Sequence, residues 1–264
     1  MLTSWQNPLI KQLRKLHQTK ERNRTGLFLV EGTHLVEAAC THGWTIEVLC
    51  VTEQWAAVHS ELLLRLKTTT QRVEYLSPEL LATLAGTVSP GGVVAAVQHR
   101  ERDWRTLMSA PCRLLVLGER LQDPGNVGTL VRTCTAAGAD GLVLSPDSVD
   151  PDHPKVLRAS AGLWFHSPPL RVQDFGSLLG ELALGDIQVL ATDPRATLTL
   201  WEADLTLPTA FVLGSEGQGL SPAVRALVTR QVSIPLATGV ESLNVALTAG
   251  VLLFEAVRQR RIRI

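Results

Sequence analysis

The chain has 264 residues, of which 45% are hydrophobic and 19% charged, with 25 basic and 25 acidic residues. This composition excludes a disordered chain and predicts a sizeable buried core, in two domains or in one large α/β unit. The charge is unevenly distributed, because residues 1–25 carry a net +5, residues 254–264 carry +3, and the stretch between them is acidic.

The cysteines form no CxxC pair and have no histidine at zinc-finger spacing; they are Cys40, Cys50, Cys112 and Cys134. We therefore expect buried thiols, no disulfide framework and no metal. The chain shows no secretory signal, and no apolar run reaches about 18 residues. A soluble, cytoplasmic protein with no membrane partner is the expectation.

The first part of the chain alternates strand-like and helical patterns. The strand-like runs are 27–30, 46–51, 72–76 and 93–97, and the helical patterns are 9–16, 33–40, 55–66 and 78–84. This alternation predicts a compact α/β domain at 1–100. Dense charge at 98–105 interrupts the pattern, so we place a linker at 101–111 and a second domain at 112–264.

The second part has short apolar runs bounded by Gly, Asp or Pro, at 114–117, 142–144, 188–191, 210–213 and 232–234. Such runs are typical of buried parallel strands, with helices between them, so a doubly wound parallel sheet is predicted. The last helical pattern, 243–257, is apolar on nearly every face. It is too short to cross a bilayer, so it lies either inside the domain or against a second subunit.

Three segments of the second part could carry chemistry. In 121–138 a Pro-Gly turn opens a helix that Asn126 could cap, with Arg132 six residues later. In 211–222 a strand runs into a glycine-rich turn that matches neither a dinucleotide fingerprint nor a phosphate loop. In 234–246 Ser242 and Asn244 stand where helix caps stand. Taken singly, each segment fits a purely structural role.

Together and in this order, the three segments closely resemble the motifs of the SpoU/TrmH family within the SPOUT RNA methyltransferases, over residues 113–261. Residues 4–20, 26–32 and 93–97 look like the substrate-binding domain of the ribosomal-RNA branch, whose fold is similar to ribosomal protein L30e. The resemblance implies a parallel-sheet domain with a deep C-terminal trefoil knot, a smaller N-terminal L30e-like α/β domain, and a homodimer formed through the knotted domain.

The resemblance also implies an enzyme. S-adenosylmethionine would donate a methyl group to the 2′-hydroxyl of a ribose in structured RNA, leaving S-adenosylhomocysteine, and no metal is expected. The implied substrate is 23S-type ribosomal RNA. The alternatives are a transfer-RNA 2′-O-methyltransferase and a non-catalytic RNA-binding relative of the same fold. A nucleotide-dependent oxidoreductase would also suit the α/β pattern, but the sequence lacks its fingerprint.

By position in the motifs, the implied catalytic residues are Asn126, Arg132, Glu216, Ser242 and Asn244. The implied cofactor-binding residues are Leu213, Gly214, Ser215, Gly217, Ile234, Leu236, Leu243 and Ala246. Because a guanidinium stays protonated, we expect Arg132 to clamp a phosphate and stabilise the developing alkoxide, and not to act as a simple base. The expected RNA-binding residues are Lys11, Arg14, Lys15, Lys20, Arg22 and Arg24, and their contacts should weaken steeply with salt.

Overall fold

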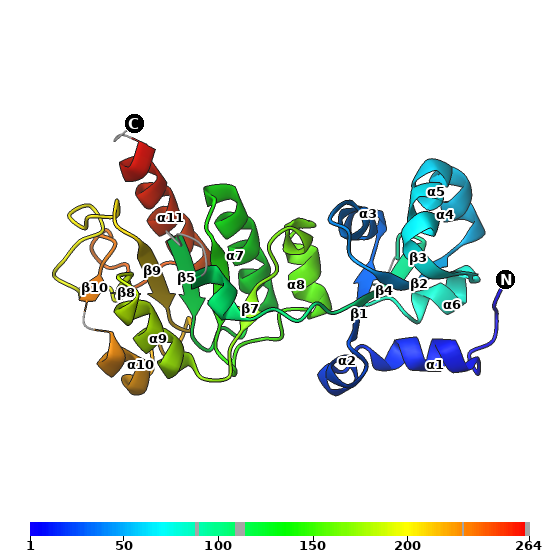
Figure 1. Ribbon diagram of the computed structural model, residues 1–264, viewed down its shortest axis with the longest axis horizontal. Helices are drawn as coiled ribbons and strands as arrows, with labels where there is room; N and C mark the ends of the chain where they lie inside the picture. The colour runs from blue at the N-terminus through cyan, green and yellow to red at the C-terminus, as the bar shows by residue number, and fades with distance from the viewer. Residues whose placement is uncertain (88–89, 109–113, 229, 262–264) are drawn as a thin grey trace. The chain divides into compact units, whose positions relative to one another are not determined.

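The computed structural model describes residues 1–87, 90–108, 114–228 and 230–261 (Figure 1). The chain divides into two compact units. The first contains residues 1–101 together with 152–166, and the second contains 102–151 together with 167–264. The segment 152–166 lies within the second domain of the sequence-based boundaries, whereas its side chains pack with the first unit.

The first unit is built on a four-stranded sheet in the order β1-β4-β2-β3. Strand β4 runs antiparallel to β1 and β2, and β2 runs parallel to β3. The strands are β1 (Leu27–Glu31), β2 (Ile46–Val51), β3 (Thr70–Tyr75) and β4 (Val93–Gln98). The helices are α1 (Pro8–Lys15), α2 (Thr19–Thr25), α3 (Thr33–Thr41), α4 (Glu53–Val58), α5 (Ser60–Thr69) and α6 (Pro78–Ala82).

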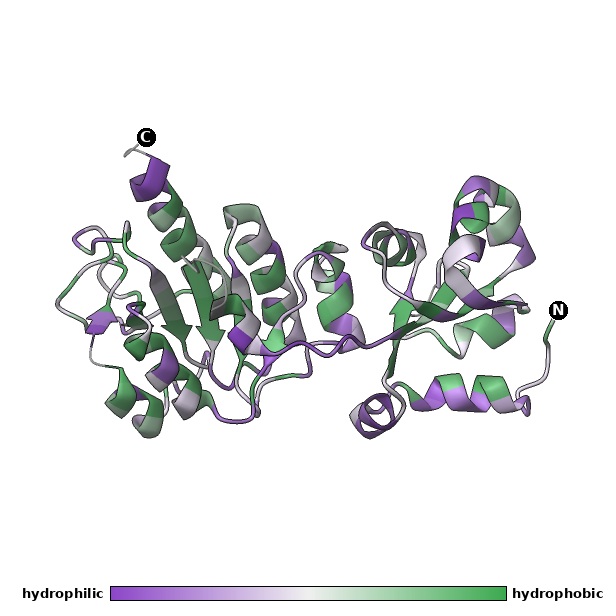
Figure 2. Ribbon diagram, viewed as in Figure 1, coloured by the Kyte–Doolittle hydropathy of each residue, from purple (hydrophilic) through white to green (hydrophobic). Residues whose placement is uncertain are grey.

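Helix α1 shows how the sequence produces its amphipathic surface. Asn7 caps the helix by accepting a hydrogen bond from the Leu9 amide at 2.9 Å, and Pro8 supplies a favourable first residue. Ile10 and Leu13 are buried in the core, while the basic side chains point outward. Figure 2 shows the helix as one hydrophobic and one hydrophilic side. The helix therefore presents its positive charges to solvent.

The segment 152–166 joins the first unit through helix α8 (Pro154–Ala159) and the short helix η2 (Leu163–Phe165). The rings of Phe28 and Trp164 lie 5.2 Å apart between centroids, and those of Trp44 and Trp164 lie 5.1 Å apart. The Trp44 indole also donates to the Phe165 carbonyl at 3.0 Å. Aromatic packing of this kind buries large apolar surfaces and explains why the segment belongs to this unit.

A buried ion pair ties the same segment to α2. The Arg22 guanidinium donates to the Asp152 carboxylate at 3.0 Å, and the two side chains are 1% and 3% exposed. Arg22 also donates to the carbonyls of Leu16 and His17. Arg22 was expected to bind RNA phosphate; the structure corrects this, because its guanidinium is buried and satisfied inside the unit.

The second unit is built on a six-stranded sheet in the order β10-β8-β9-β5-β6-β7, with every neighbouring pair parallel. This confirms the predicted parallel sheet. The strands are β5 (Leu114–Gly118), β6 (Gly141–Leu144), β7 (Leu170–Arg171), β8 (Gln188–Thr192), β9 (Thr209–Leu213) and β10 (Arg230–Val232). The helical segments are η1 (Trp104–Met108), α7 (Pro124–Ala137), α9 (Phe175–Leu184), α10 (Pro222–Leu227) and α11 (Val245–Arg261).

Both faces of this sheet are covered. Leu115 and Leu117 of β5 pack in one core with Phe175 and Leu178 of α9. The alternate residue Val116 is also buried, as strand periodicity requires when both faces are covered. Helices α7 and α11 contact each other, and α11 contacts β9 (Figure 1). One side of α11 is thus buried within the unit.

The cysteines of the described residues behave largely as expected. Burial raises the pKa of the Cys50 and Cys134 thiols to about 12, which keeps them protonated and unreactive. Cys40 is only half-buried, and Cys112 lies outside the described residues. Within the described part of the chain, no helix is long and apolar enough to cross a membrane.

The buried ion pair gives a stability prediction. Replacing Arg22 with Ala removes the guanidinium from the buried Asp152 carboxylate, which keeps its contact with His99 Nε2 at 2.5 Å. The first unit should therefore lose about 3 kcal/mol of unfolding free energy, the lower end of the range for breaking a buried ion pair. Urea denaturation followed by tryptophan fluorescence measures the change. Arg24→Ala is the control, because Arg24 is 61% exposed in its pair with Glu21, and its removal should leave the midpoint unchanged. Equal midpoints for both variants would contradict the assignment.

Candidate functional site

The candidate site forms where two neighbouring parallel strands end. Strands β5 and β9 pair in register up to Gly118 and Leu213, so the loops that follow them leave the same edge of the sheet. In open parallel sheets, ligands bind outside the carboxyl ends of the strands where the strand order reverses. From β5 the chain continues to β6 on one side, while β9 lies on the other. This edge is therefore the expected ligand site.

The loop after β5 starts helix α7 differently from the sequence-based expectation. Asp123 caps the helix by accepting a hydrogen bond from the Gly125 amide at 2.9 Å, with Pro124 at the first helical position. The prediction that Asn126 caps this helix is therefore wrong, because Asp123, three residues earlier, is the cap. The Asn126 side chain is left free to interact with the other loops.

A chain of hydrogen bonds joins all three motif segments. The Asn126 amide group donates to Glu216 Oε1, and the Asn244 amide group donates to Asn126 Oδ1 at 2.9 Å. Asn244 Oδ1 in turn accepts from the backbone amides of Ala246 and Leu247, at 2.9 and 3.3 Å. Asn244 is thus the predicted cap of α11. The first turn of α11 therefore fixes Asn244, which orients Asn126, which holds Glu216.

The other two predicted catalytic residues stand outside this chain. Arg132 lies on α7 and is exposed, and it makes no hydrogen bond or ion pair with any described residue. The neighbouring hydroxyls of Thr129 and Thr133 donate to helix carbonyls and do not engage it. Ser242 is exposed and likewise lacks a hydrogen bond within the described ranges. The structure brings together Asn126, Glu216 and Asn244 and leaves Arg132 available to a ligand.

The glycine-rich turn after β9 is closed by backbone hydrogen bonds. The Ser215 amide donates to the Gly219 carbonyl at 3.2 Å, and the Gly219 amide donates to the Ser215 carbonyl at 2.9 Å. A Cβ at Gly214 would lie 2.3 Å from the Gly219 carbonyl carbon, so only glycine fits there. Beyond it, Gly217 is exposed, with no atom within 4 Å of its Cβ position. A ligand can approach this backbone closely.

The remaining predicted cofactor residues differ in exposure. Ile234 and Leu236 are half-buried, Leu243 is 37% exposed, and Ser215 is half-buried in the turn. Leu213 and Ala246 are 1% and 3% exposed. Only the first four can offer side-chain surface to a ligand, whereas Leu213 and Ala246 support the loops from within.

Two further residues of this site, Glu119 and Arg120, were not predicted from the sequence. Glu119 is 6% exposed and accepts from the Ser221 amide at 2.8 Å, which fastens the loop after β5 to the end of the glycine-rich turn. Arg120 has a left-handed backbone with φ of 53° and donates to Gln218 and Gly219 at 3.4 Å. Both residues directly follow a buried strand, and residues at the carboxyl end of a parallel strand are candidates for a ligand site. That position in the sequence could have predicted them.

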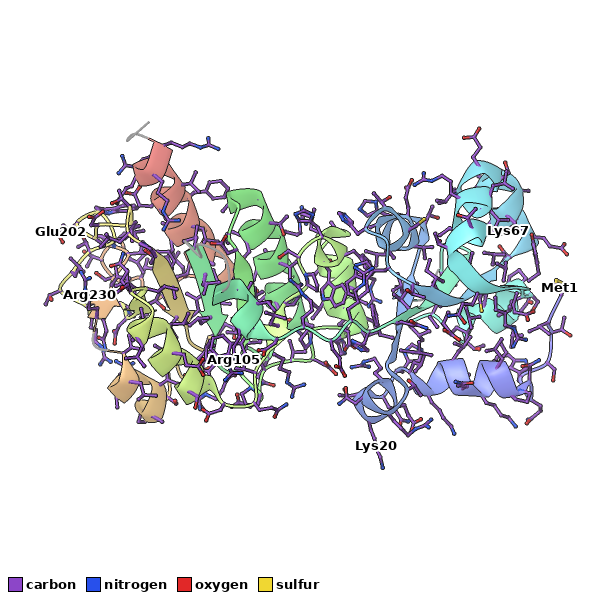
Figure 3. The ribbon with its side chains drawn as sticks, in the orientation of Figure 1. Met1, Lys20, Lys67, Arg105, Glu202 and Arg230 are labelled. Atoms are coloured by element: carbon purple, nitrogen blue, oxygen red, sulfur yellow. The ribbon has the colours of Figure 1, made fainter. Side chains whose placement is uncertain are left out.

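Of the predicted RNA-binding residues, all except Arg22 are exposed; they are Lys11, Arg14, Lys15, Lys20 and Arg24. Figure 3 shows the Lys20 side chain extending away from the ribbon. Arg24 is engaged by Glu21 at 2.8 Å, and this contact lowers the pKa of the Glu21 carboxyl. The free positive charge of this surface therefore comes mainly from α1 and Lys20.

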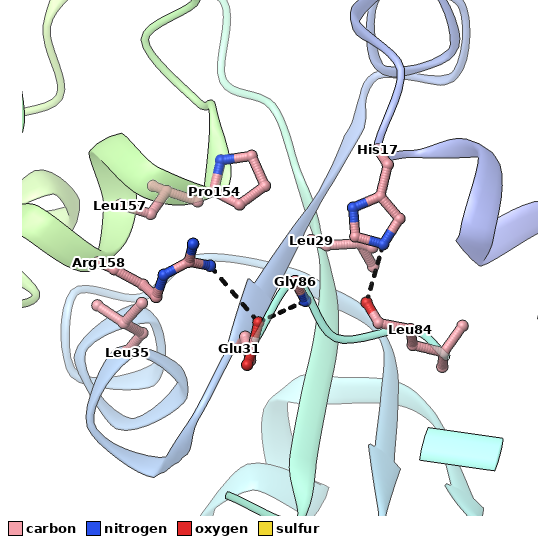
Figure 4. Close-up of a pocket in the computed structure, with 9 residues that line it drawn as sticks. All are labelled: His17, Leu29, Glu31, Leu35, Leu84, Gly86, Pro154, Leu157 and Arg158. Atoms are coloured by element: carbon pink, nitrogen blue, oxygen red, sulfur yellow. Dashed lines mark hydrogen bonds and ion pairs between the residues drawn. The ribbon is translucent and has the colours of Figure 1, made fainter. Parts of the chain in front are cut away.

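A cavity in the first unit contains none of the predicted site residues (Figure 4). In its lining, Glu31 accepts from the Gly86 amide at 2.8 Å and forms an ion pair with Arg158 at 3.6 Å, while the buried Arg158 Nη1 makes no hydrogen bond with a described residue. His17 bonds to the Leu84 carbonyl at 3.1 Å. Within the described residues, no group of three or more His, Cys, Asp or Glu side chains could hold a metal ion.

The fold and the site define an α/β protein in which three sequence motifs meet at one edge of a parallel sheet, the candidate ligand site. The model of the SpoU rRNA methylase family matches residues 113–254, and that of the MRM3-like substrate binding domain matches residues 7–95. The chain therefore belongs to the SpoU rRNA methylase family.

Individual relatives match nearly the whole chain. An uncharacterized tRNA/rRNA methyltransferase of Synechocystis is 48% identical, over 98% of this chain and 94% of its own. The 23S rRNA (guanosine(2553)-2′-O)-methyltransferase RlmP of Bacillus subtilis is 32% identical, over 96% and 97%. The crystal structure of the SpoU methyltransferase AviRb from Streptomyces viridochromogenes in complex with AdoMet gives a TM-score of 0.87 at 33% identity, covering 97% and 99%.

Two substitutions of Asn244 distinguish its role as the cap of α11 from its hydrogen bond to Asn126. Asn244→Ala removes the helix cap and should lower the unfolding free energy by about 1 kcal/mol. Asn244→Asp keeps an oxygen that can cap α11, so it should retain most of the stability while losing the donor to Asn126. Urea denaturation measures both variants, and Ser242→Ala serves as control because Ser242 makes no hydrogen bond with the described residues. An Asp variant as unstable as the Ala variant would refute the capping role.

Proposed function

We propose that this protein transfers the methyl group of S-adenosylmethionine to a ribose 2′-hydroxyl of 23S-type ribosomal RNA. The observation that carries the proposal is the hydrogen-bond chain through Asn244, Asn126 and Glu216, because it unites the three family motifs at the ligand-binding edge of the sheet. The match of residues 7–95 to a substrate-binding domain supports a large structured RNA as the acceptor. The named activity of the Bacillus relative supports ribosomal RNA in particular.

The residues at this edge suit such a cofactor. Gly214 and Gly217 allow close approach of an adenosine to the turn, and the half-buried Ile234 and Leu236 offer apolar surface for an adenine. Ser215 adds a hydroxyl beside the turn, and Leu243 a partly exposed side chain before α11, while Leu213 and Ala246 would hold the surrounding backbone in place. When bound, the cofactor supplies an electrophilic methyl group on a sulfonium centre. No metal is required for this chemistry.

Arg132 would bind the RNA substrate. It is exposed and without a partner among the described residues, so its guanidinium can form a bidentate contact with a phosphate next to the target ribose. The same positive charge would stabilise the alkoxide that develops as the 2′-hydroxyl loses its proton. Asn126 and Asn244 would orient the ribose, and Glu216 and Ser242 would shape the loops. Alignment of the reacting atoms would supply much of the rate.

A knotted chain and a homodimer complete the proposal for the second unit. Ser233 pairs with the segment after β8 through Leu198 and Leu200, and Gln259 near the end of α11 bonds to Ala203 and Leu205. These contacts support a C-terminal segment enclosed by the chain, as a trefoil knot requires. Leu247 and Phe254 leave 62% and 51% of their surface exposed on α11, which supports a second copy of this unit as the partner. For the first unit we propose an L30e-like fold.

Replacing Arg132 with Ala should lower methyl transfer by about 100-fold or more, because charge stabilisation in the transition state is lost. Binding of S-adenosylmethionine should stay unchanged, since Arg132 faces the RNA in this proposal. Transfer of a radiolabelled methyl group to ribosomal RNA from cells lacking the protein measures the first quantity, and calorimetry the second. Arg230→Ala, which removes an exposed arginine of β10, is the matched control. Turnover that survives in the Arg132 variant would exclude the assigned role.

Replacing Gly214 with Ala should weaken S-adenosylmethionine binding by about ten-fold or more, because the added methyl group overlaps the backbone of Gly219 and displaces the turn. Titration calorimetry of the full chain measures the affinity. Gly180→Ala in α9 is the control, because nothing lies within 4 Å of the Cβ position at Gly180. This variant should bind S-adenosylmethionine with the affinity of the wild type. Wild-type affinity in the Gly214 variant would show that the turn does not hold the cofactor.

A further inference from the structure

We propose that Trp5 is a stacking platform for an unpaired base of the RNA, and that Arg14 beside it anchors the adjoining phosphate. This inference rests on the proposed function, because it takes RNA as the substrate, and it adds the structural feature of the RNA that the first unit would select. Trp5 lies in the segment 4–20 that resembles a substrate-binding domain, but outside the matched residues 7–95, and it is not among the expected RNA-binding residues.

The turn that carries Trp5 is fixed on both sides. Before it, Leu2 pairs with Leu76, and its amide donates to the Tyr75 carbonyl at 2.6 Å. Within it, the Asn7 amide donates to the Ser4 carbonyl at 3.2 Å, and Asn7 then caps α1. The indole therefore projects from a defined position, so that binding a base would cost little ordering of the chain.

Trp5 differs from the core tryptophans of the same unit. Trp44 and Trp55 are each 3% exposed, and their indole N–H groups donate to Phe165 at 3.0 Å and to Thr33 at 2.7 Å. Trp5 is 50% exposed, and its N–H makes no hydrogen bond with any described residue. A large ring held in this way adds little to the core, and it leaves both apolar surface and a donor available to a ligand.

The charge around Trp5 selects the kind of ligand. The Arg14 guanidinium lies 6.0 Å from the centre of the Trp5 ring, and Lys11 and Lys15 are exposed on the same short helix, which has no acidic residue. The hydrophilic side of α1 in Figure 2 is this basic surface. An aromatic ring among cations fits a nucleotide, because the base stacks on the ring and the phosphate binds the cations. Paired bases are stacked within their helix, so the platform favours an unpaired one.

The test uses the full chain and two RNA probes of matched composition. One is a single-stranded oligonucleotide with 2-aminopurine, whose fluorescence falls when the base stacks, and the other is a fully paired duplex. Trp5→Ala should bind the single strand about ten-fold more weakly and lose the quenching, in line with the loss of one base–aromatic stack. Duplex binding should be unchanged. Trp5→Phe should restore much of the effect, and Arg14→Ala should weaken both probes and reduce the salt dependence.

Leu64→Ala is the matched control, because it removes another exposed apolar side chain of the first unit, 66% exposed on α5, and it should bind both probes as the wild type does. Single-strand binding by Trp5→Ala within two-fold of the wild type, or equal losses on both probes, would overturn the proposal. So would unchanged RNA binding combined with a loss of binding to anionic phospholipid vesicles, which would assign the surface to a membrane.

Methyl transfer measured in parallel separates this inference from the proposed function. If the wild type methylates ribosomal RNA and Trp5→Ala has the same KM, the platform is refuted while the enzyme assignment stands. A rise of about ten-fold in KM with unchanged kcat supports the platform. If the wild type transfers no methyl group but the probes still show the Trp5-dependent preference, the inference about RNA binding holds and the proposed activity fails.

Discussion

The site depends on one hydrogen-bond chain, which runs from the first turn of α11 through Asn244 and Asn126 to Glu216. Each amide in this chain uses its oxygen as acceptor and its nitrogen as donor, so the orientation of one side chain sets that of the next. An aspartate in place of either asparagine would break the alternation, because a carboxylate cannot donate. The parallel register of β5 and β9 brings the first two loops to one edge, and the cap of α11 adds the third.

Much of the fold could be predicted because it depends on local pattern. The apolar runs at 114–117 and 210–213, each followed by glycine, predicted the parallel strands β5 and β9. The identity of the α7 cap was predicted wrongly. Both Asp123 and Asn126 suit a cap by residue type, and the geometry of the Pro-Gly turn decides between them. Residue preference alone cannot predict which of two suitable residues, three positions apart, caps the helix.

Non-local contacts explain what the sequence could not predict. The segment 152–166 lies between two motifs of the family, yet its aromatic residues pack on Phe28 and Trp44, more than a hundred positions earlier. The chain therefore passes between the two units three times. The first unit cannot complete its core until residue 166 has been synthesised, because Trp164 and Phe165 belong to it. No periodicity within 1–100 indicates that a later segment is needed.

The two arginines, Arg22 and Arg132, show why residue type and charge alone do not assign function. Both were candidates for binding RNA, and both lie on helices with polar neighbours. Arg22 is buried, and its guanidinium donates to Asp152 and to two backbone carbonyls. A phosphate would have to replace these buried hydrogen-bond partners in order to bind it. Arg132 is exposed and free of partners among the described residues, so a phosphate would add contacts without breaking any. The free energy available for recognition is therefore greater at Arg132, and that difference lies in the surroundings of each guanidinium.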